Sequence, residues 1–301
     1  MPKIAVLIPC YNEELTVEKT VSDFRKAIPE AEIYVYDNNS TDRTAELAKN
    51  AGAIVRKEPH QGKGNVVRAM FRDIDADAYV LVDGDDTYPA DEVRKLLAPV
   101  LYDRADMVIG DRLSNGTYFS ENKRAFHEFG NTLVKRLINS FFRSDIKDIM
   151  TGYRVFSKRF VKCIPITSQG FQIETEITAY ALMMRMNIVE IPIEYRDRPE
   201  GSYSKLNTFR DGVKVMITLF DLIKDYKPLY FSFFFFVFFL LVGCASLLLL
   251  RGQTVFIIGL MLFMIAVLFL AVGMILDSIK NHTIKCMEDT LNRYSVTDKN
   301  Q

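Results

Sequence analysis

Two carboxylates, Asp83 and Asp85, stand two residues apart directly after the apolar run Ala78–Val82. Hard divalent cations such as Mg²⁺ and Mn²⁺ bind oxygen ligands of this kind, and a cation held there could bridge a diphosphate and offset charge on a leaving group. The same spacing also occurs in ordinary turns. The pair therefore indicates a candidate metal site whose meaning depends on its surroundings.

Polar residues follow other apolar runs in the same manner. Asp37 comes after Glu32–Tyr36 and could accept hydrogen bonds from a base or a ribose, although turn and helix-capping chemistry also explains Asp37–Ser40. The segment His60–Gly64 lacks the spacing of a phosphate-binding loop. The polar residues that follow these runs are Tyr11, Asn12 and Glu13; Asp37, Asn38 and Asn39; Asp83 to Thr87; and Asp111 and Arg112.

The elements that must position these residues alternate between strand-like and helix-like segments. This alternation predicts an α/β fold with a mostly parallel, doubly wound sheet, in which ligands bind beyond the carboxyl ends of the strands. The candidate residues all lie at such ends. The expected strands are Lys3–Pro9, Glu32–Tyr36, Ala53–Arg56, Ala78–Val82 and Asp106–Ile109.

The C-terminal part has a different composition, with Arg251 as the one charged residue between Pro228 and Leu276. Leu229–Leu250 and Thr254–Leu276 would each span roughly 33–35 Å as a helix, enough to cross a bilayer. The short turn between them predicts a transmembrane hairpin, and the alternative is a buried hairpin in a soluble core. Lysines flank the hairpin on both outer sides, so the positive-inside rule predicts a multi-pass plasma-membrane protein with a cytoplasmic N-terminal domain.

Apolar residues between Asn207 and Asp225 recur at spacings of three and four, which predicts an amphipathic helix. This helix either packs on the N-terminal domain or lies in the lipid interface. The expected domains are therefore 1–206 for the α/β domain, 207–227 for the amphipathic helix, 228–279 for the hairpin and 280–301 for a cytoplasmic tail.

Charge and cysteine content exclude some classes of protein. The formal net charge is zero, which argues against a nucleic-acid-binding protein. The segment Asp111–Lys162 is nevertheless basic, which suits an anionic partner near a membrane. The four cysteines have no metal-ligand spacing and predict no disulfide framework.

Taken together, the motifs resemble the family 2 glycosyltransferases with a GT-A fold. The likeness is carried by Pro9-Cys-Tyr-Asn-Glu13, Asp37-Asn-Asn-Ser-Thr-Asp-Arg-Thr44, Gly62-Lys-Gly64 and Asp83-Gly-Asp85. Later segments resemble the polyprenyl-phosphate branch of that family, which includes the dolichyl-phosphate mannose synthases. These segments are Gly110-Asp-Arg112, Arg124, Asn131, Asp148-Ile-Met-Thr-Gly-Tyr-Arg154, Gly170-Phe-Gln-Ile-Glu-Thr-Glu176 and Arg198-Pro-Glu-Gly-Ser-Tyr-Ser-Lys205.

The resemblance implies roles for individual residues. Asp83 and Asp85 would hold Mg²⁺ or Mn²⁺, and Asp85, Arg112 and Arg124 would be the catalytic residues. The lipid phosphate would be bound by Arg112, Arg124, Arg198 and Lys205. The nucleotide would be bound by Pro9, Tyr11, Asn12, Glu13, Asp37, Asn39, Gly62, Lys63, Asp83 and Gly84. The sequence departs from the mannose synthases at Thr87, where that group often has Gln, and at Asn38, where the family commonly has Asp.

The resemblance also implies a reaction, the inverting transfer of a hexose from a nucleotide-sugar to polyprenyl (undecaprenyl) phosphate at the cytoplasmic membrane face. A lipid phosphate is already ionised, so no general base is required, and His60, His127 and His282 need not be catalytic. UDP-glucose is the expected donor, with UDP-N-acetylglucosamine and GDP-mannose as alternatives. The lipid bilayer is a further partner, and two membrane helices are compatible with a homo-oligomer.

Two other functions remain as rivals. A catalytically silent membrane scaffold would keep the fold with a vestigial nucleotide pocket. A processive polysaccharide synthase would share the fold but would need a multi-helix channel and a tryptophan-containing acceptor motif, and this chain has no tryptophan.

Overall fold

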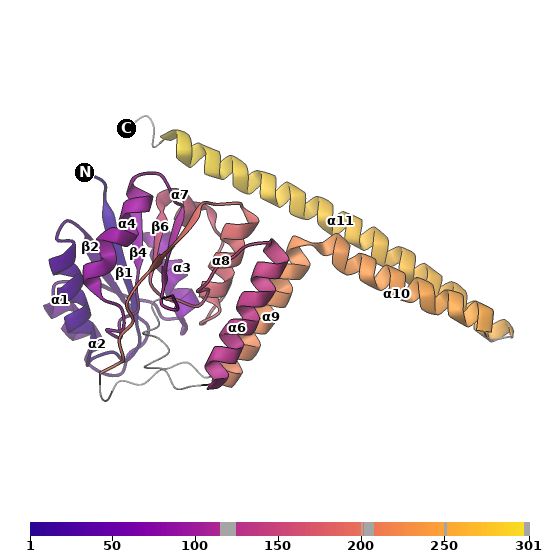
Figure 1. Cartoon of the computed structure of the whole chain (residues 1–301), viewed down its shortest axis with the longest axis horizontal. Helices are drawn as coiled ribbons and strands as arrows, with labels where there is room; N and C mark the ends of the chain where they lie inside the picture. Colours follow the sequence, from indigo (N-terminus) through magenta and orange to yellow (C-terminus); the bar gives the residue numbers. More distant parts are fainter. Residues whose placement is uncertain (115–124, 200, 202–207, 250–251, 298–301) are drawn as a thin grey trace. The chain divides into compact units, whose positions relative to one another are not determined.

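The computed structural model describes residues 1–114, 125–199, 201, 208–249 and 252–297 (Figure 1). The chain divides into two compact units, residues 1–219 together with 291–301, and residues 220–290. Arg124 and Lys205, for which phosphate-binding roles are expected, lie outside the described residues.

The first unit contains a seven-stranded sheet with the order β3-β2-β1-β4-β6-β5-β7. Strand β6 is antiparallel to its neighbours β4 and β5, and the other neighbouring strands are parallel. The predicted mostly parallel α/β sheet is thus confirmed. The strands are β1 (Ile4–Cys10), β2 (Glu32–Asp37), β3 (Ile54–Lys57), β4 (Ala78–Leu81), β5 (Met107–Asp111), β6 (Arg154–Ser157) and β7 (Ile188–Pro192).

Helices cover both faces of this sheet (Figure 1). Val6 and Ile8 of β1 join a core with Phe24 of α1 and Leu96 of α4. Leu7, which alternates with them, is also fully buried. Strands covered on both faces are expected to be continuously apolar, as β1 is. The helices of this unit include α1 (Val17–Ala27), α2 (Thr44–Asn50), α3 (Lys63–Asp73), η1 (Ala90–Glu92), α4 (Val93–Leu101), α6 (Ala125–Phe142), α7 (Lys158–Cys163) and α8 (Ile173–Met183).

Aromatic packing fixes α3 and α7 against the second face. The Phe71 ring of α3 contacts Tyr79 of β4 and Phe156 of β6, and Phe156 stacks on Phe160 of α7 at 4.8 Å between ring centroids. Offset and edge-to-face ring pairs of this kind add to the free energy gained from burial. The start of α3, which carries Lys63, is therefore anchored through its apolar face.

The second unit contains two long helices, α10 (Pro228–Leu249) and most of α11 (Gln253–Thr297). The amphipathic helix α9 (Thr208–Tyr226) precedes α10 in the chain. Helices α10 and α11 pack antiparallel: Phe235 and Phe239 of α10 stack on Phe269 of α11, and Gly243 faces Gly259. Both helices are long and apolar enough to cross a membrane. The predicted hairpin is present, and α11 continues without a break beyond Leu276, where its predicted membrane span ends.

Candidate active site at the carboxyl end of the sheet

A cavity of about 450 Å³ lies beyond the carboxyl ends of β1 and β4. Segments that are distant in the sequence meet there, because parallel strands direct their following loops to one edge of the sheet. The cavity brings together nine of the residues with predicted roles. These are Pro9, Tyr11, Glu13, Gly62, Lys63, Asp83, Gly84, Asp85 and Arg198.

Other predicted residues shape the loops around the cavity without lining it. The Asn12 side chain accepts a hydrogen bond from the Thr41 amide at 2.8 Å, and the Asn39 side chain donates to the Pro59 carbonyl at 2.8 Å. Asp37, which is buried, accepts a hydrogen bond from the Ser40 amide at 3.2 Å. This geometry matches the turn chemistry that the sequence left open for Asp37. Direct nucleotide contacts from these three residues stay a prediction.

Asp83 is paired with a buried lysine. The Lys63 ammonium lies 2.5 Å from Asp83 Oδ1 and 2.6 Å from Glu174 Oε1, and the Lys63 side chain is only 9% exposed. Burial alone would lower the pKa of Lys63, but the two carboxylates raise it above its ordinary value. Lys63 is therefore a fixed positive charge at the cavity wall.

Asp85 is paired with an arginine. Its Oδ2 contacts the Arg198 guanidinium, and its Oδ1 accepts a hydrogen bond of 2.7 Å from the Thr87 hydroxyl. The same guanidinium lies 3.8 Å from Glu13 Oε1. Burial and the neighbouring Asp83 raise the pKa of Asp85. Asp85 is buried and Asp83 is partly exposed, and two carboxylates this close repel each other, so cations stabilise them.

The two carboxylates fit a divalent cation that is shared with a phosphate ligand. Mg²⁺ is commonly bound in proteins by one or two carboxylates together with substrate phosphates and water. Asp83 and Asp85 supply such a donor pair on one cavity. Across the described residues, no group of three or more His, Cys, Asp or Glu side chains converges as a complete protein-only metal site.

Gly62 and Gly64 allow the start of α3 to approach another backbone segment. A Cβ atom at Gly62 would lie 2.1 Å from the Gln169 carbonyl oxygen, and one at Gly64 would lie 2.1 Å from the Ser168 carbonyl oxygen. Gly62 also has a φ of +130°, which favours glycine. The close approach places Lys63 between β4 and α8, where it reaches both Asp83 and Glu174.

Asn38 lines the cavity and organises the loop of residues 58–62, a role that the sequence did not predict. Its side-chain amide donates to the carbonyls of Glu58 and His60 at 2.9 and 2.8 Å, and its Oδ1 accepts from the Gly62 amide at 2.6 Å. An Asp at this position would lack both donors. Asn38 therefore fixes the loop that leads into Gly62 and Lys63.

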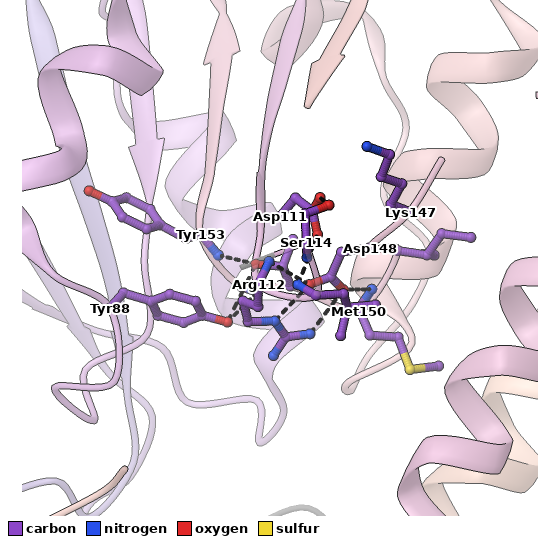
Figure 2. A network of polar contacts seen from close by, with 12 residues as sticks. Tyr88, Asp111, Arg112, Ser114, Lys147, Asp148, Met150 and Tyr153 are labelled. Atoms are coloured by element: carbon purple, nitrogen blue, oxygen red, sulfur yellow. Dashed lines mark hydrogen bonds and ion pairs between the residues drawn. The ribbon is translucent and has the colours of Figure 1, made fainter. Parts of the chain in front are cut away.

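Arg112 forms a further buried ion pair near the end of β5. Its guanidinium donates two hydrogen bonds to Asp148, at 2.8 and 3.0 Å (Figure 2). It also lies over the Tyr195 ring, 5.4 Å from the ring centroid. Tyr88, whose hydroxyl accepts from the Gly152 amide at 2.9 Å, belongs to the same network. Arg112 does not line the cavity described above. Its predicted contact with a lipid phosphate stays a prediction.

Several lining residues had no predicted role. Gln169, Gly170 and Phe171 enter from the segment before α8, and Lys214 enters from α9. The segment Gly170–Glu176 was identified only by its resemblance to the polyprenyl-phosphate branch of the family. Spacing could not place Lys214 at the cavity or Glu174 beside Lys63, because tertiary packing brings their helices there.

Residues 5–164, more than half of the chain, match the family described as glycosyl transferase family 2. The chain belongs to glycosyl transferase family 2. Two curated relatives of this glycosyltransferase come from Haloferax volcanii. Glycosyltransferase AglJ is 34% identical over 229 residues, which cover 76% of this chain and 74% of AglJ. A dolichyl-phosphate hexose transferase is 30% identical over 212 residues, covering 70% of this chain and 90% of that protein.

A solved structure supports the fold of this glycosyltransferase. Mycobacterium tuberculosis glucosyl-3-phosphoglycerate synthase, crystallised with Mn²⁺, UDP-glucose and glycerol 3-phosphate, has a TM-score of 0.59 and 19% sequence identity. The alignment covers 72% of this chain and 80% of the synthase. The predicted GT-A fold is confirmed, and the family members above place the glycosyltransferase in the polyprenyl-phosphate branch.

Proposed function

We propose that this glycosyltransferase moves glucose from UDP-glucose to undecaprenyl phosphate, with inversion at the anomeric carbon. The observation that carries the proposal is the cavity in which Asp83 and Asp85 face Lys63 and Arg198. A cavity with both charge signs suits a reaction between two anionic molecules. The dolichyl-phosphate relative supports a polyprenyl phosphate acceptor, and the synthase solved with UDP-glucose supports the donor.

Some residues of the cavity would bind the sugar donor and others the lipid acceptor. Asp83 and Asp85 would hold Mg²⁺ or Mn²⁺, which when bound offsets charge on the leaving diphosphate. Lys63 reaches the same space from α3, and its charge stabilises the donor phosphates. Arg198 and Lys214 line the cavity and attract the acceptor phosphate. That phosphate is ionised at neutral pH, so it attacks without a general base.

The two apolar helices support a membrane location for this reaction. A polyprenyl chain resides in the bilayer, and α10 and α11 are both long enough to cross it. The flanking lysines Lys224, Lys227, Lys280 and Lys285 favour a cytoplasmic catalytic domain. The activated donor would then be taken from the cytoplasm and the acceptor from the membrane.

The test is transfer of radiolabelled sugar to undecaprenyl phosphate by the full chain in detergent. UDP-glucose, UDP-N-acetylglucosamine and GDP-mannose are compared, each with Mg²⁺, with Mn²⁺ and with EDTA. Lipid-extractable product from UDP-glucose that EDTA abolishes is the expected result. Product from a different donor alone would refute glucose transfer, and no product from any donor would refute the acceptor assignment.

A matched pair of variants tests the carboxylates. Asp85→Asn should lower transfer by about 100-fold or more, because a buried group that acts on the transition state is lost. Asp86→Asn removes the adjacent charge, which pairs with Lys19 outside the cavity, and should leave transfer nearly unchanged. Equal activity of the two variants would contradict the role of Asp85.

A further inference from the structure

Each of the two candidate metal-binding carboxylates belongs to a bridge of acid, cation and acid. In one bridge, Lys63 lies 2.5 Å from Asp83 and 2.6 Å from Glu174. In the other, Arg198 contacts Asp85 and lies 3.8 Å from Glu13. The second acid of each bridge lies outside the Asp83-Gly84-Asp85 sequence, and Glu174 comes from a separate helix, α8.

Lys63 is the more buried of the two bridging cations. The side chains of Lys63 and Glu174 are 9% and 6% exposed, whereas Arg198 is 27% exposed. A buried charge that loses its partner is strongly destabilised. A divalent cation that binds Asp83 would take away one partner of Lys63, and Glu174 would remain as the other.

We propose that Glu174 is a positioning residue that retains the Lys63 ammonium at the cavity wall when a divalent cation takes Asp83. This inference rests on the proposed function, because that function assigns the cation to Asp83 and Asp85. The Lys63 ammonium pairs with both Glu174 and Asp83. Because Glu174 takes part of this interaction, the ion pair between Lys63 and the metal-binding Asp83 is weaker. Lys63 then remains directed into the cavity, with donor capacity left for a phosphate oxygen.

Glu176 offers a matched comparison on the same helix. Its carboxylate accepts hydrogen bonds from the Ser168 amide at 2.9 Å and the Thr167 amide at 3.0 Å, and it is 1% exposed. It holds the backbone segment on which Gly64 packs, whereas the ion pairs of Lys63 within the described residues are with Asp83 and Glu174. Glu176→Gln therefore removes a buried charge that is not a member of the bridge and keeps an oxygen acceptor for the 167–168 segment.

The experiment measures Mn²⁺ binding directly, by electron paramagnetic resonance of free Mn²⁺, with the full chain in detergent and no sugar donor. Binding that Asp85→Asn abolishes defines the site. Glu174→Gln should weaken that binding by about tenfold, because Lys63 then pairs with Asp83 alone. Glu174→Asp, which keeps the charge, should recover most of the loss, and Glu176→Gln should leave Mn²⁺ affinity unchanged.

A double-mutant cycle identifies the route of the effect. In a Lys63→Met background, Glu174→Gln should no longer change Mn²⁺ affinity, since Glu174 acts through Lys63. An equal loss in both backgrounds, no loss in either, or no Asp85-dependent Mn²⁺ binding by the unaltered protein would overturn the inference. Sugar transfer, measured on the same preparations, reports separately whether the proposed function holds.

Discussion

Replacing Gly64 with alanine tests whether the contact between α3 and the segment before α8 is as close as the structure shows. The added Cβ would lie 2.1 Å from the Ser168 carbonyl oxygen and 2.9 Å from the Gln169 carbonyl carbon. These are backbone atoms, so no side chain can rotate away. Since Cβ contacts under 3.0 Å are essentially never seen, α3 and this segment must separate.

The separation has an energetic cost that can be worked out in order of magnitude. Overpacking costs about 1–3 kcal/mol. The separation also strains the hydrogen bond from the Asn65 amide to the Gln169 carbonyl, and a bond of this type contributes about 1 kcal/mol. Gly64→Ala should therefore lower the free energy of unfolding by about 3 kcal/mol, and the melting temperature by roughly 6–12 °C. Transfer should fall as well, because Lys63 is displaced.

The assay is urea unfolding in detergent, followed by far-ultraviolet circular dichroism because the chain has no tryptophan. The control is Gly212→Ala in α9, where an added Cβ meets nothing within 4 Å. This control should be neutral or stabilising by about 0.5–1 kcal/mol, as expected for alanine in an exposed helix. If Gly64→Ala is as stable as Gly212→Ala, the close approach is refuted.

Three further predictions concern other contacts. Asp148→Asn should lower the free energy of unfolding by about 3 kcal/mol, because the buried Arg112 loses its counterion; a change within 0.5 kcal/mol in urea unfolding would contradict a buried pair. Asn38→Asp should raise the KM for the sugar donor more than it lowers kcat, since two donors to the loop before Lys63 are lost; an unchanged KM would count against this role. Burial raises the pKa of the Cys163 thiol from 9.0 to about 11, so alkylation at pH 8, followed by peptide mass spectrometry, should be about 100-fold slower than in the urea-unfolded chain. Between pH 9 and 11 the folded chain keeps a proton on Cys163 that the unfolded chain has lost, so this thiol lowers the free energy of unfolding as the pH rises. Equal alkylation rates in the folded and unfolded states would refute the raised pKa.

Strands β1, β4 and β5 could be predicted because their residues are mostly apolar and buried on both faces. Strand β7 was not among the expected strands, because its residues are only partly buried and Glu190 stands at its centre. Strand β6 could not be predicted either, because its first residue, Arg154, is charged and fully buried. Its guanidinium donates to the Thr151 carbonyl at 3.1 Å and the Thr178 hydroxyl at 2.8 Å, so tertiary contacts satisfy it. Burial also lowers the pKa of Arg154 to about 10. No local sequence pattern predicts a strand that begins with a buried arginine.

The candidate site was predictable where it depends on strand ends and unpredictable where it depends on packing between elements. Asp83 and Asp85 directly follow an apolar strand, so their position at the sheet edge follows from the sequence. Glu174 reaches Lys63 only because Gly62 and Gly64 admit a second backbone segment. The Arg112 pairing with Asp148 spans 36 residues and has no signal in spacing.

Strands β5 and β6 are joined by a much longer segment than their antiparallel pairing requires. These strands are hydrogen-bonded neighbours, with Met107 opposite Phe156, and antiparallel neighbours can be joined by a two-residue turn. The chain instead inserts everything from Arg112 to Tyr153 there, including α6. The C-terminal end of this insertion is tied to the sheet, since Tyr153 belongs to the core and an added Cβ at Gly152 would lie 2.3 Å from the Asp83 carboxylate. Changes in length are therefore expected to disturb the Asp83 edge less around α6 than next to Tyr153, in natural relatives and in engineered variants alike.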